Sequence, residues 1–112
     1  MKFNIDKTEI INEFQSLAAV ADKKQTLPIL SNILIRCESG SIKLLSTDLE
    51  VELNVTLSGA KIDQPGETTI PAKKAADIIR ELPEGQVSFE LDEESSKLTV
   101  RSSSGKYNLS TI

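Results

Sequence analysis

The feature that most constrains the fold of this 112-residue chain is the order in which its hydrophobic periodicity changes. A period of two is typical of a half-buried strand, and a period near 3.6 is typical of an amphipathic helix. The order strand, helix, three strands occurs twice. The first copy predicts a strand at 2–6, a helix at 7–21 and strands at 28–37, 41–47 and 50–58; the second predicts a strand at 66–70, a helix at 72–82 and strands at 86–92, 97–102 and 106–112.

This repetition predicts an architecture of the α+β class. One helix with a few antiparallel strands has a single apolar face, and neither copy could bury that face alone. We therefore expect one domain over residues 1–112, built from two pseudo-symmetric halves, 1–60 and 61–112, with antiparallel sheets outside and the two helices side by side on one face. The expected core consists of Phe3, Ile10, Phe14, Leu17, Leu30, Ile33, Leu44, Val51, Leu53, Ile79, Leu82, Phe89, Leu91, Leu98 and Val100.

The composition narrows the classes of function. The single cysteine, Cys37, excludes an internal disulfide and favours a reducing compartment, so we expect a cytoplasmic protein without a signal peptide or membrane contact. The chain has no histidine, no phosphate-binding GxxxxGK[ST] loop and no metal-ligand spacing, which predicts neither catalysis nor a metal or cofactor. A net charge of −4 argues against nucleic acid as a partner for the chain as a whole, although only local charge meets a partner.

The predicted helix at 72–82 has an unusual charge distribution. Lys73 and Lys74 follow Pro71 at the beginning of the helix, where the positive end of the helix dipole makes cations mildly unfavourable. One interpretation is a solvated face on which Lys73, Lys74 and Arg80 pair with nearby acidic residues such as Asp77. The other is a site for an anion, because an exposed helix N-terminus and two lysines point positive potential in the same direction. The residues alone favour the solvated face.

Several segments together resemble a known family. They are "MKF", "TLPILSNILI", "STDLEVEL", "GETTIPAKKAADIIRELPEG" and "YNLSTI", which follow one another in the order and spacing of the first domain of the bacterial sliding clamp, the β subunit of DNA polymerase III. The resemblance covers the whole chain. It implies the DNA clamp fold and a ring of two subunits with three similar domains each. Such a ring encircles duplex DNA, is lined by helices, tethers the polymerase to its template and performs no chemistry.

The resemblance also implies residues that contact DNA. Lys24 and Lys73 match positions at which the family has basic residues in contact with DNA, and Arg80 lies on the same predicted helix face as Lys73. Such contacts would reach phosphates and would not depend on the base sequence. The helix at 7–21 carries Glu9 and Glu13 and no basic residue between 8 and 21, so we expect no DNA contact from it.

A second implied surface is the boundary between subunits. Lys74 and Ile78 in the helix match family positions at this boundary, as do Lys106, Tyr107 and Leu109 in the last strand. We expect Tyr107 and Leu109 to share one exposed face of an unpaired edge strand. Ser103 and Ser104 stand where the family often has arginine, which departs from its charge pattern. The groove that receives polymerase and clamp-loader peptides belongs to the later domains. The alternative function is a protein-interaction domain that never contacts nucleic acid.

Overall fold

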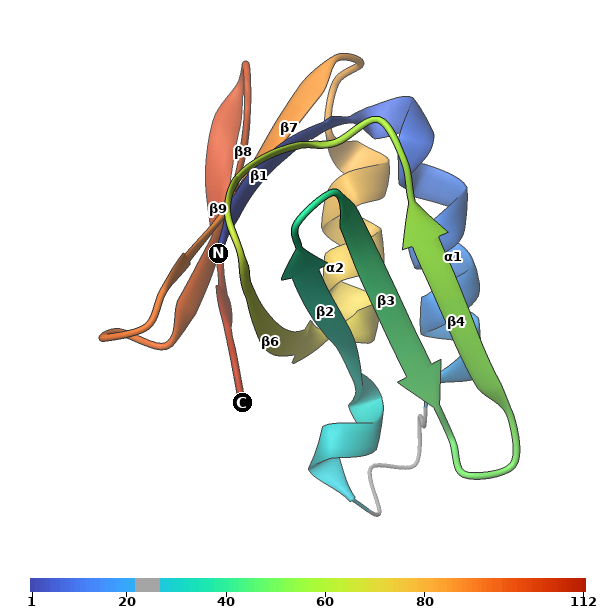
Figure 1. Cartoon of the computed structure of the whole chain (residues 1–112). Coiled ribbons are helices and arrows are strands. Elements are labelled where there is room, and N and C mark those ends of the chain that lie inside the picture. The colour runs from blue at the N-terminus through green and yellow to red at the C-terminus, as the bar shows by residue number, and fades with distance from the viewer. Residues whose placement is uncertain (22–26) are drawn as a thin grey trace.

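The computed structural model describes residues 1–21 and 27–112. Figure 1 shows their course. The first half contains β1 (Lys2–Asp6), the short 3-10 helix η1 (Lys7–Glu9), α1 (Ile11–Val20), the 3-10 helix η2 (Pro28–Ser31), β2 (Asn32–Glu38), β3 (Ser41–Thr47) and β4 (Glu52–Leu57). The second contains β5 (Lys61–Gln64), β6 (Gly66–Pro71), α2 (Ala72–Glu81), β7 (Gln86–Asp92), β8 (Lys97–Ser102) and β9 (Gly105–Ser110).

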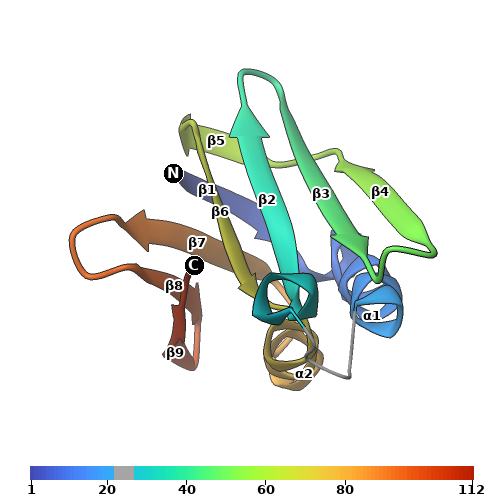
Figure 2. The same ribbon diagram turned by 90° about the horizontal axis from the view of Figure 1, so that it is seen from below.

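The strands form two antiparallel sheets, and each half lends the strand that precedes its α-helix, β1 or β6, to the sheet of the other half. The five-stranded sheet has the order β5-β1-β7-β8-β9, and the four-stranded sheet has the order β4-β3-β2-β6. β1 therefore pairs with β7, and β6 pairs with β2. Because of this exchange, the two sheets contain equivalent strand orders, β1-β7-β8-β9 and β6-β2-β3-β4. In this equivalence β1 corresponds to β6, α1 to α2 and β4 to β9, so the predicted pseudo-symmetry is confirmed. Figure 2 shows α1 and α2 next to each other on one side of the domain, and the two sheets enclose its remaining sides.

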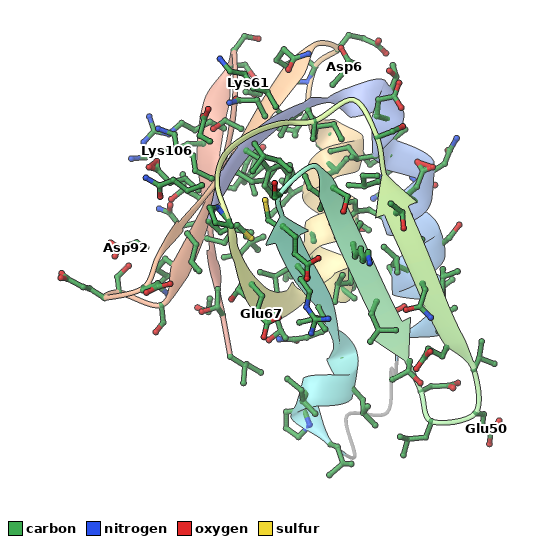
Figure 3. All side chains as sticks on the ribbon, in the orientation of Figure 1. Asp6, Glu50, Lys61, Glu67, Asp92 and Lys106 are labelled. Atoms are coloured by element: carbon green, nitrogen blue, oxygen red, sulfur yellow. The ribbon has the colours of Figure 1, made fainter. Side chains whose placement is uncertain are left out.

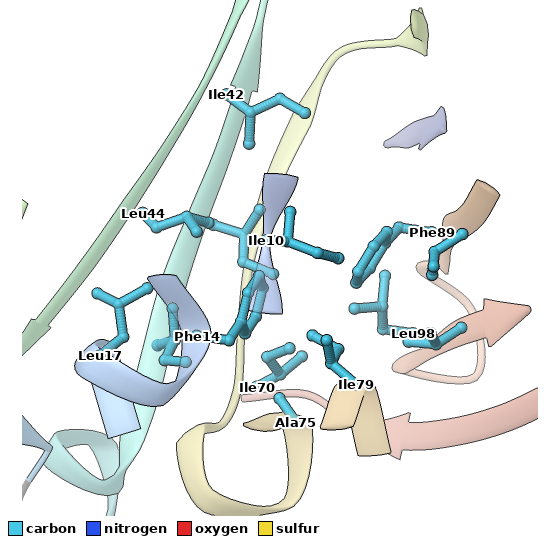
Figure 4. Close-up of a cluster of buried hydrophobic side chains, with 14 of the residues drawn as sticks. Ile10, Phe14, Leu17, Ile42, Leu44, Ile70, Ala75, Ile79, Phe89 and Leu98 are labelled. Atoms are coloured by element: carbon cyan, nitrogen blue, oxygen red, sulfur yellow. The ribbon is translucent and has the colours of Figure 1, made fainter. Parts of the chain in front are cut away.

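The core lies between the helix pair and the two sheets. The rings of Phe3 and Phe89 stack with their centroids 4.7 Å apart, and Phe14 from α1 lies 6.3 Å from Phe89. Figure 4 shows how aliphatic side chains from both halves surround Phe14 and Phe89. Most of the predicted core is confirmed as buried, namely Phe3, Ile10, Phe14, Leu17, Ile33, Leu44, Ile79, Leu82, Phe89, Leu98 and Val100, while Leu53 and Leu91 are partly buried against it.

Two predicted core residues are not in the core. Val51 is 53% exposed because a turn occupies 48–51 and β4 begins only at Glu52. Leu30 is only partly buried because it lies in η2 and not in a strand. Pro28 occupies the first turn of η2, where its fixed φ and missing N–H favour a helical turn over a strand.

Between the strands predicted at 50–58 and 66–70, the structure contains a further strand that the sequence does not indicate. β5 has Ile62 as its single large apolar residue, so it shows no alternating pattern. Its backbone is held by antiparallel pairing with β1, in which Phe3 lies opposite Ile62. The helix predicted at 7–21 is also divided, because Asp6 caps η1 through its side chain before α1 begins at Ile11. Neither α1 nor α2, each of 10 residues, is long enough to cross a membrane.

Candidate nucleic-acid interface

The connection from β6 to α2 determines which residues of α2 lie on the exposed face of the helix pair. Pro71 ends β6 and serves as the N-cap of α2, and Ala72, Ala75, Ala76 and Ile79 then point into the core. Because this apolar stripe fixes the rotation of the helix, Lys73 and Lys74 are directed to the surface. No side-chain cap is found at Pro71 and no acidic residue lies in the first turn, so the N-terminal N–H groups and the two lysines act together as a positive end.

A groove runs between the two helices on this face. Its volume is about 610 Å³, and it is lined by Gln15, Ala18, Ala19 and Ala21 from the α1 side, by Ser31, and by Ala72, Lys73, Ala76, Asp77 and Arg80 from the α2 side. Small alanine side chains on both helices leave the space open, and every charged group among the described lining residues comes from α2. The structure thus brings Lys73 and Arg80 together along one groove, as the helical spacing predicts.

The three basic residues of α2 differ in their ion pairs. Arg80 lies 3.3 Å from the Asp77 carboxylate and 3.8 Å from that of Glu81. Acidic neighbours on its own helix therefore partly neutralise Arg80, which is the arrangement that the solvated-face interpretation expects. Across residues 1–21 and 27–112, neither Lys73 nor Lys74 forms an ion pair. Within those residues, no carboxylate competes with an external anion for these two ammonium groups.

Among the described residues, no charged side chain lines the groove from the α1 side. Gln15 and Ala19 are exposed along it, whereas Glu13 is partly buried and Glu9 lies outside the helix in η1. This agrees with the expectation that the first helix supplies no basic contact. Gln15 and Ser31 are lining residues that the sequence pattern did not identify, because nothing in the local periodicity indicates that they border the groove across from α2.

The predicted subunit surface lies at a free sheet edge. β9 ends the five-stranded sheet on the α2 side of the molecule, and β4 ends the other sheet on the α1 side (Figures 1 and 2). Lys106 and Tyr107 are exposed there, and Ile78 is partly buried in α2. The expectation that Leu109 exposes its side chain is wrong. Leu109 lies opposite Leu98 in the sheet and is only 6% exposed, so it belongs to the domain's own core.

Comparison with known proteins decides the family. The family model for the N-terminal domain of the DNA polymerase III beta subunit matches residues 1–112. The chain belongs to this family. The beta sliding clamp of Escherichia coli (strain K12) is 35% identical over 113 residues, and that of Pseudomonas aeruginosa is 40% identical over 114 residues. Each alignment covers 100% of this chain and 30% of the relative, so the chain spans 30% of the length of these curated relatives.

Solved structures of the same family share this fold. The crystal structure of the DNA polymerase III subunit beta from Pseudomonas aeruginosa superposes with a TM-score of 0.92 at 35% identity. The DNA polymerase sliding clamp from Caulobacter crescentus superposes with a TM-score of 0.92 at 31% identity. Both matches cover 100% of this chain and 30% of the other chain. The predicted clamp fold of this beta-subunit domain is thereby confirmed.

Two predicted features of this beta-subunit domain remain to be placed. Lys24 lies outside the described residues, so its position relative to the groove stays a prediction. At the β9 edge, Lys106 lies directly opposite Arg101 of β8. Like charges at directly opposed positions of a sheet are unfavourable. The sequence could have indicated this pair, because a hairpin turn at residues 102–105 places residue 106 opposite residue 101. Figure 3 shows Lys106 at this edge.

Metal-binding clusters and the single cysteine are further kinds of candidate site. In the part of the chain that the structure describes, no group of three or more cysteine and acidic side chains is placed to hold a metal ion. The thiol of Cys37 is buried, and this burial raises its pKa. A buried thiol in apolar surroundings is protonated and inert, so Cys37 is a core residue of its strand.

Proposed function

We propose that residues 1–112 form the first of three similar domains of a sliding clamp. Two such subunits would close into a ring around duplex DNA and tether DNA polymerase III to its template. The observation that carries this proposal is the pair of helices on one face, with Lys73 beside the groove between them and in no ion pair with any residue that the structure describes. The family match over all 112 residues supports the same assignment.

The proposed contact with DNA is electrostatic. Lys73 and Lys24 would approach phosphates, and the uncapped N-terminus of α2 would add its partial positive charge. Arg80 would contribute less, because Asp77 and Glu81 compete for its guanidinium group. The proposed contacts reach phosphates and no base edge, so binding would not depend on base sequence. A net charge of −4 would keep such contacts weak, which suits a ring that slides.

The proposed ring also requires protein partners. We assign Lys74, Ile78, Lys106 and Tyr107 to the boundary with the second subunit, together with the main chain of Leu109 at the free edge of β9. DNA polymerase III and the clamp loader would bind through the domains that follow in the full-length protein. The protein would act in the cytoplasm as an accessory factor with no catalytic activity of its own.

The alternative is an interaction domain that binds proteins only. The acidic balance of the chain and the exposed edge strand favour it. Salt-dependent association with duplex DNA distinguishes the two, because a domain that binds only proteins shows none.

The test is fluorescence anisotropy of a labelled duplex of random sequence, titrated with the chain at several salt concentrations. We expect weak binding whose logarithm falls linearly with log salt, with a slope of about −0.9 for each phosphate contacted. Lys73→Glu combined with Lys24→Glu should abolish binding. The matched control is Lys43→Glu, which makes the same charge change on the exposed side of β3. Equal binding by the Lys24/Lys73 double variant and the wild type would show that this face does not meet DNA.

A further inference from the structure

The turn between β3 and β4 presents a leucine in an unfavourable conformation. Leu49 has φ of +80°, in the left-handed region that a leucine seldom adopts. Its side chain is 74% exposed, so packing within the domain does not compensate for this conformation. A glycine or asparagine would serve the turn better. Strain of this kind is retained where the surrounding structure imposes it, and such positions concentrate at functional sites.

The turn is held rigidly by its neighbours. Asp48 Oδ1 accepts hydrogen bonds from the main-chain N–H groups of Glu50 at 2.9 Å and Val51 at 2.8 Å. The Thr47 hydroxyl accepts from Leu49 N–H at 3.0 Å and donates to the carbonyl of Val51 at 2.7 Å. The N–H of Asp48 donates to the same carbonyl at 3.2 Å. These five bonds fix the backbone, so Leu49 is displayed in one orientation before any partner arrives.

Other apolar side chains gather at the same end of the sheet. Leu34 pairs with Leu45, which places the beginning of β2 and the end of β3 at one end; η2 and the 48–51 turn therefore project together (Figure 1). Among the described residues, six large apolar side chains are exposed, and four of them are here: Leu27, Ile29, Leu49 and Val51. Exposed apolar residues concentrated at one end of a domain are a feature of interaction sites.

The charges around Leu49 indicate the chemistry of the partner. Asp48, Glu50 and Glu52 flank the two apolar residues of the turn, and Figure 3 shows Glu50 at its tip. Three carboxylates repel phosphate, so this end does not bind DNA directly. A protein that itself binds DNA has a basic surface around its DNA path, which complements an acidic rim.

We propose that the Leu49 turn docks into an apolar socket, rimmed by lysine or arginine, on a DNA-binding protein that shares the duplex with this chain. Leu49 fills the socket, Val51 packs at its edge, and Glu50 pairs with the basic rim. This inference rests on the proposed function, which places such a protein beside the chain on DNA. The contact through the Leu49 turn would be additional to the polymerase contact that the proposed function assigns to the domains that follow. The turn and the Lys73 groove are separate surfaces, so they can be tested independently.

The probe is the purified catalytic subunit of DNA polymerase III from the source organism, titrated into the ¹⁵N-labelled 112-residue chain. We expect amide shift changes around residues 27–29 and 48–52. Leu49→Gly should weaken the affinity at least about tenfold, which is the effect of removing one buried leucine side chain. The same variant should raise the melting temperature, because glycine relieves the left-handed strain. Glu50→Lys should also weaken binding, through repulsion from the basic rim.

The matched control is Ser96→Gly, which relieves a positive φ of 54° in the β7–β8 turn. It should raise stability and leave polymerase binding unchanged. Equal affinity of Leu49→Gly and the wild type, or no detectable binding to the chain, would overturn the proposal. The proposal would also be overturned if the wild-type chain associated with itself as its concentration rises and Leu49→Gly did not. The partner of the Leu49 turn would then be a second copy of the chain. DNA binding is measured separately, by fluorescence anisotropy of the labelled duplex. Leu49→Gly should bind DNA as the wild type does, whereas Lys73→Glu should weaken DNA binding. The DNA measurement therefore tests the proposed function, and the polymerase measurement tests the Leu49 turn.

Discussion

The side-chain amino group of Lys7 donates a hydrogen bond to the main-chain oxygen of Arg80, 3.1 Å away at the C-terminal end of α2. A second bond from the same group reaches the carbonyl of Leu82, and the main-chain N–H of Lys7 donates to the carbonyl of Gly85 at 2.9 Å. A residue of the first half thus satisfies carbonyls that the helix leaves free, and its charge faces the negative end of the helix dipole.

Replacing Lys7 by methionine should therefore reduce the free energy of unfolding. The methionine keeps most of the aliphatic stem but leaves two carbonyls without their donor, and we expect a loss of about 1–2 kcal/mol in urea denaturation. Lys43→Met is the control, because Lys43 is exposed on β3 and should change stability by less than about 0.5 kcal/mol. Equal effects of the two variants would mean that Lys7 does not stabilise α2.

The second prediction concerns the contribution of the stacked phenylalanines to stability. Phe89 contacts both Phe3 and Phe14 and is 1% exposed, so Phe89→Ala should leave a cavity and lower stability by about 3–5 kcal/mol. Tyr107→Ala, at the exposed edge, should lower it by less than about 1 kcal/mol. Thermal and urea unfolding of both variants measures the difference, and a loss below about 1 kcal/mol for Phe89→Ala would contradict its central place in the core.

Gly66 is required by a close approach of two chain segments. A Cβ at Gly66 would lie 2.9 Å from the Cβ of Met1 and 3.2 Å from its main-chain nitrogen, and the φ of +155° disfavours any other residue. Gly40 also has a positive φ, of +86°, but open space around it. Gly66→Ala should therefore lose more stability than Gly40→Ala, by about 1–3 kcal/mol from the clash. Comparable melting temperatures of the two variants would exclude the clash.

The Asp48 carboxylate should make stability depend on acid pH. The N–H of Val51, and next that of Glu50, hold its pKa below the ordinary value of 3.8. A group with a lowered folded-state pKa contributes stability above its unfolded pKa and loses it as the pH falls through the folded pKa. The melting temperature of Asp48→Ala should therefore lie below wild type at pH 7, and the gap should narrow below about pH 4. Glu93→Ala is the control, and a gap for Asp48→Ala that persists unchanged at pH 2 would contradict the prediction.

The free edge of β9 predicts the assembly state of the isolated chain. Its proposed complement belongs to a different domain, so a single copy offers no matching edge of the same kind. We expect a monomer at micromolar concentration in sedimentation velocity, with weak edge-to-edge association at higher concentration that Tyr107→Lys reduces. A stable micromolar dimer that is insensitive to Tyr107→Lys would show that the contact lies elsewhere.

Periodicity in the sequence determined the order of the elements and most of their inward faces. The stripe of Ala75, Ala76 and Ile79 in α2 and the alternation of Val87 and Phe89 in β7 are local patterns, because a helix and a strand each repeat their side-chain directions over a few residues. The exposure of Lys73 follows from the same stripe. The DNA and subunit roles came from resemblance, since no local pattern distinguishes a phosphate-binding lysine from a solvated one.

Only the tertiary structure decided which strands pair and which polar groups meet. The exchange of β1 and β6 between halves, the strand β5, and the contact of Lys7 with α2 join segments that are far apart in the chain. Tyr107 and Leu109 share one face of β9, yet Leu109 is buried and Tyr107 is 41% exposed. Burial at a sheet edge depends on what lies across the sheet, and the alternation within a strand carries no information about that neighbour.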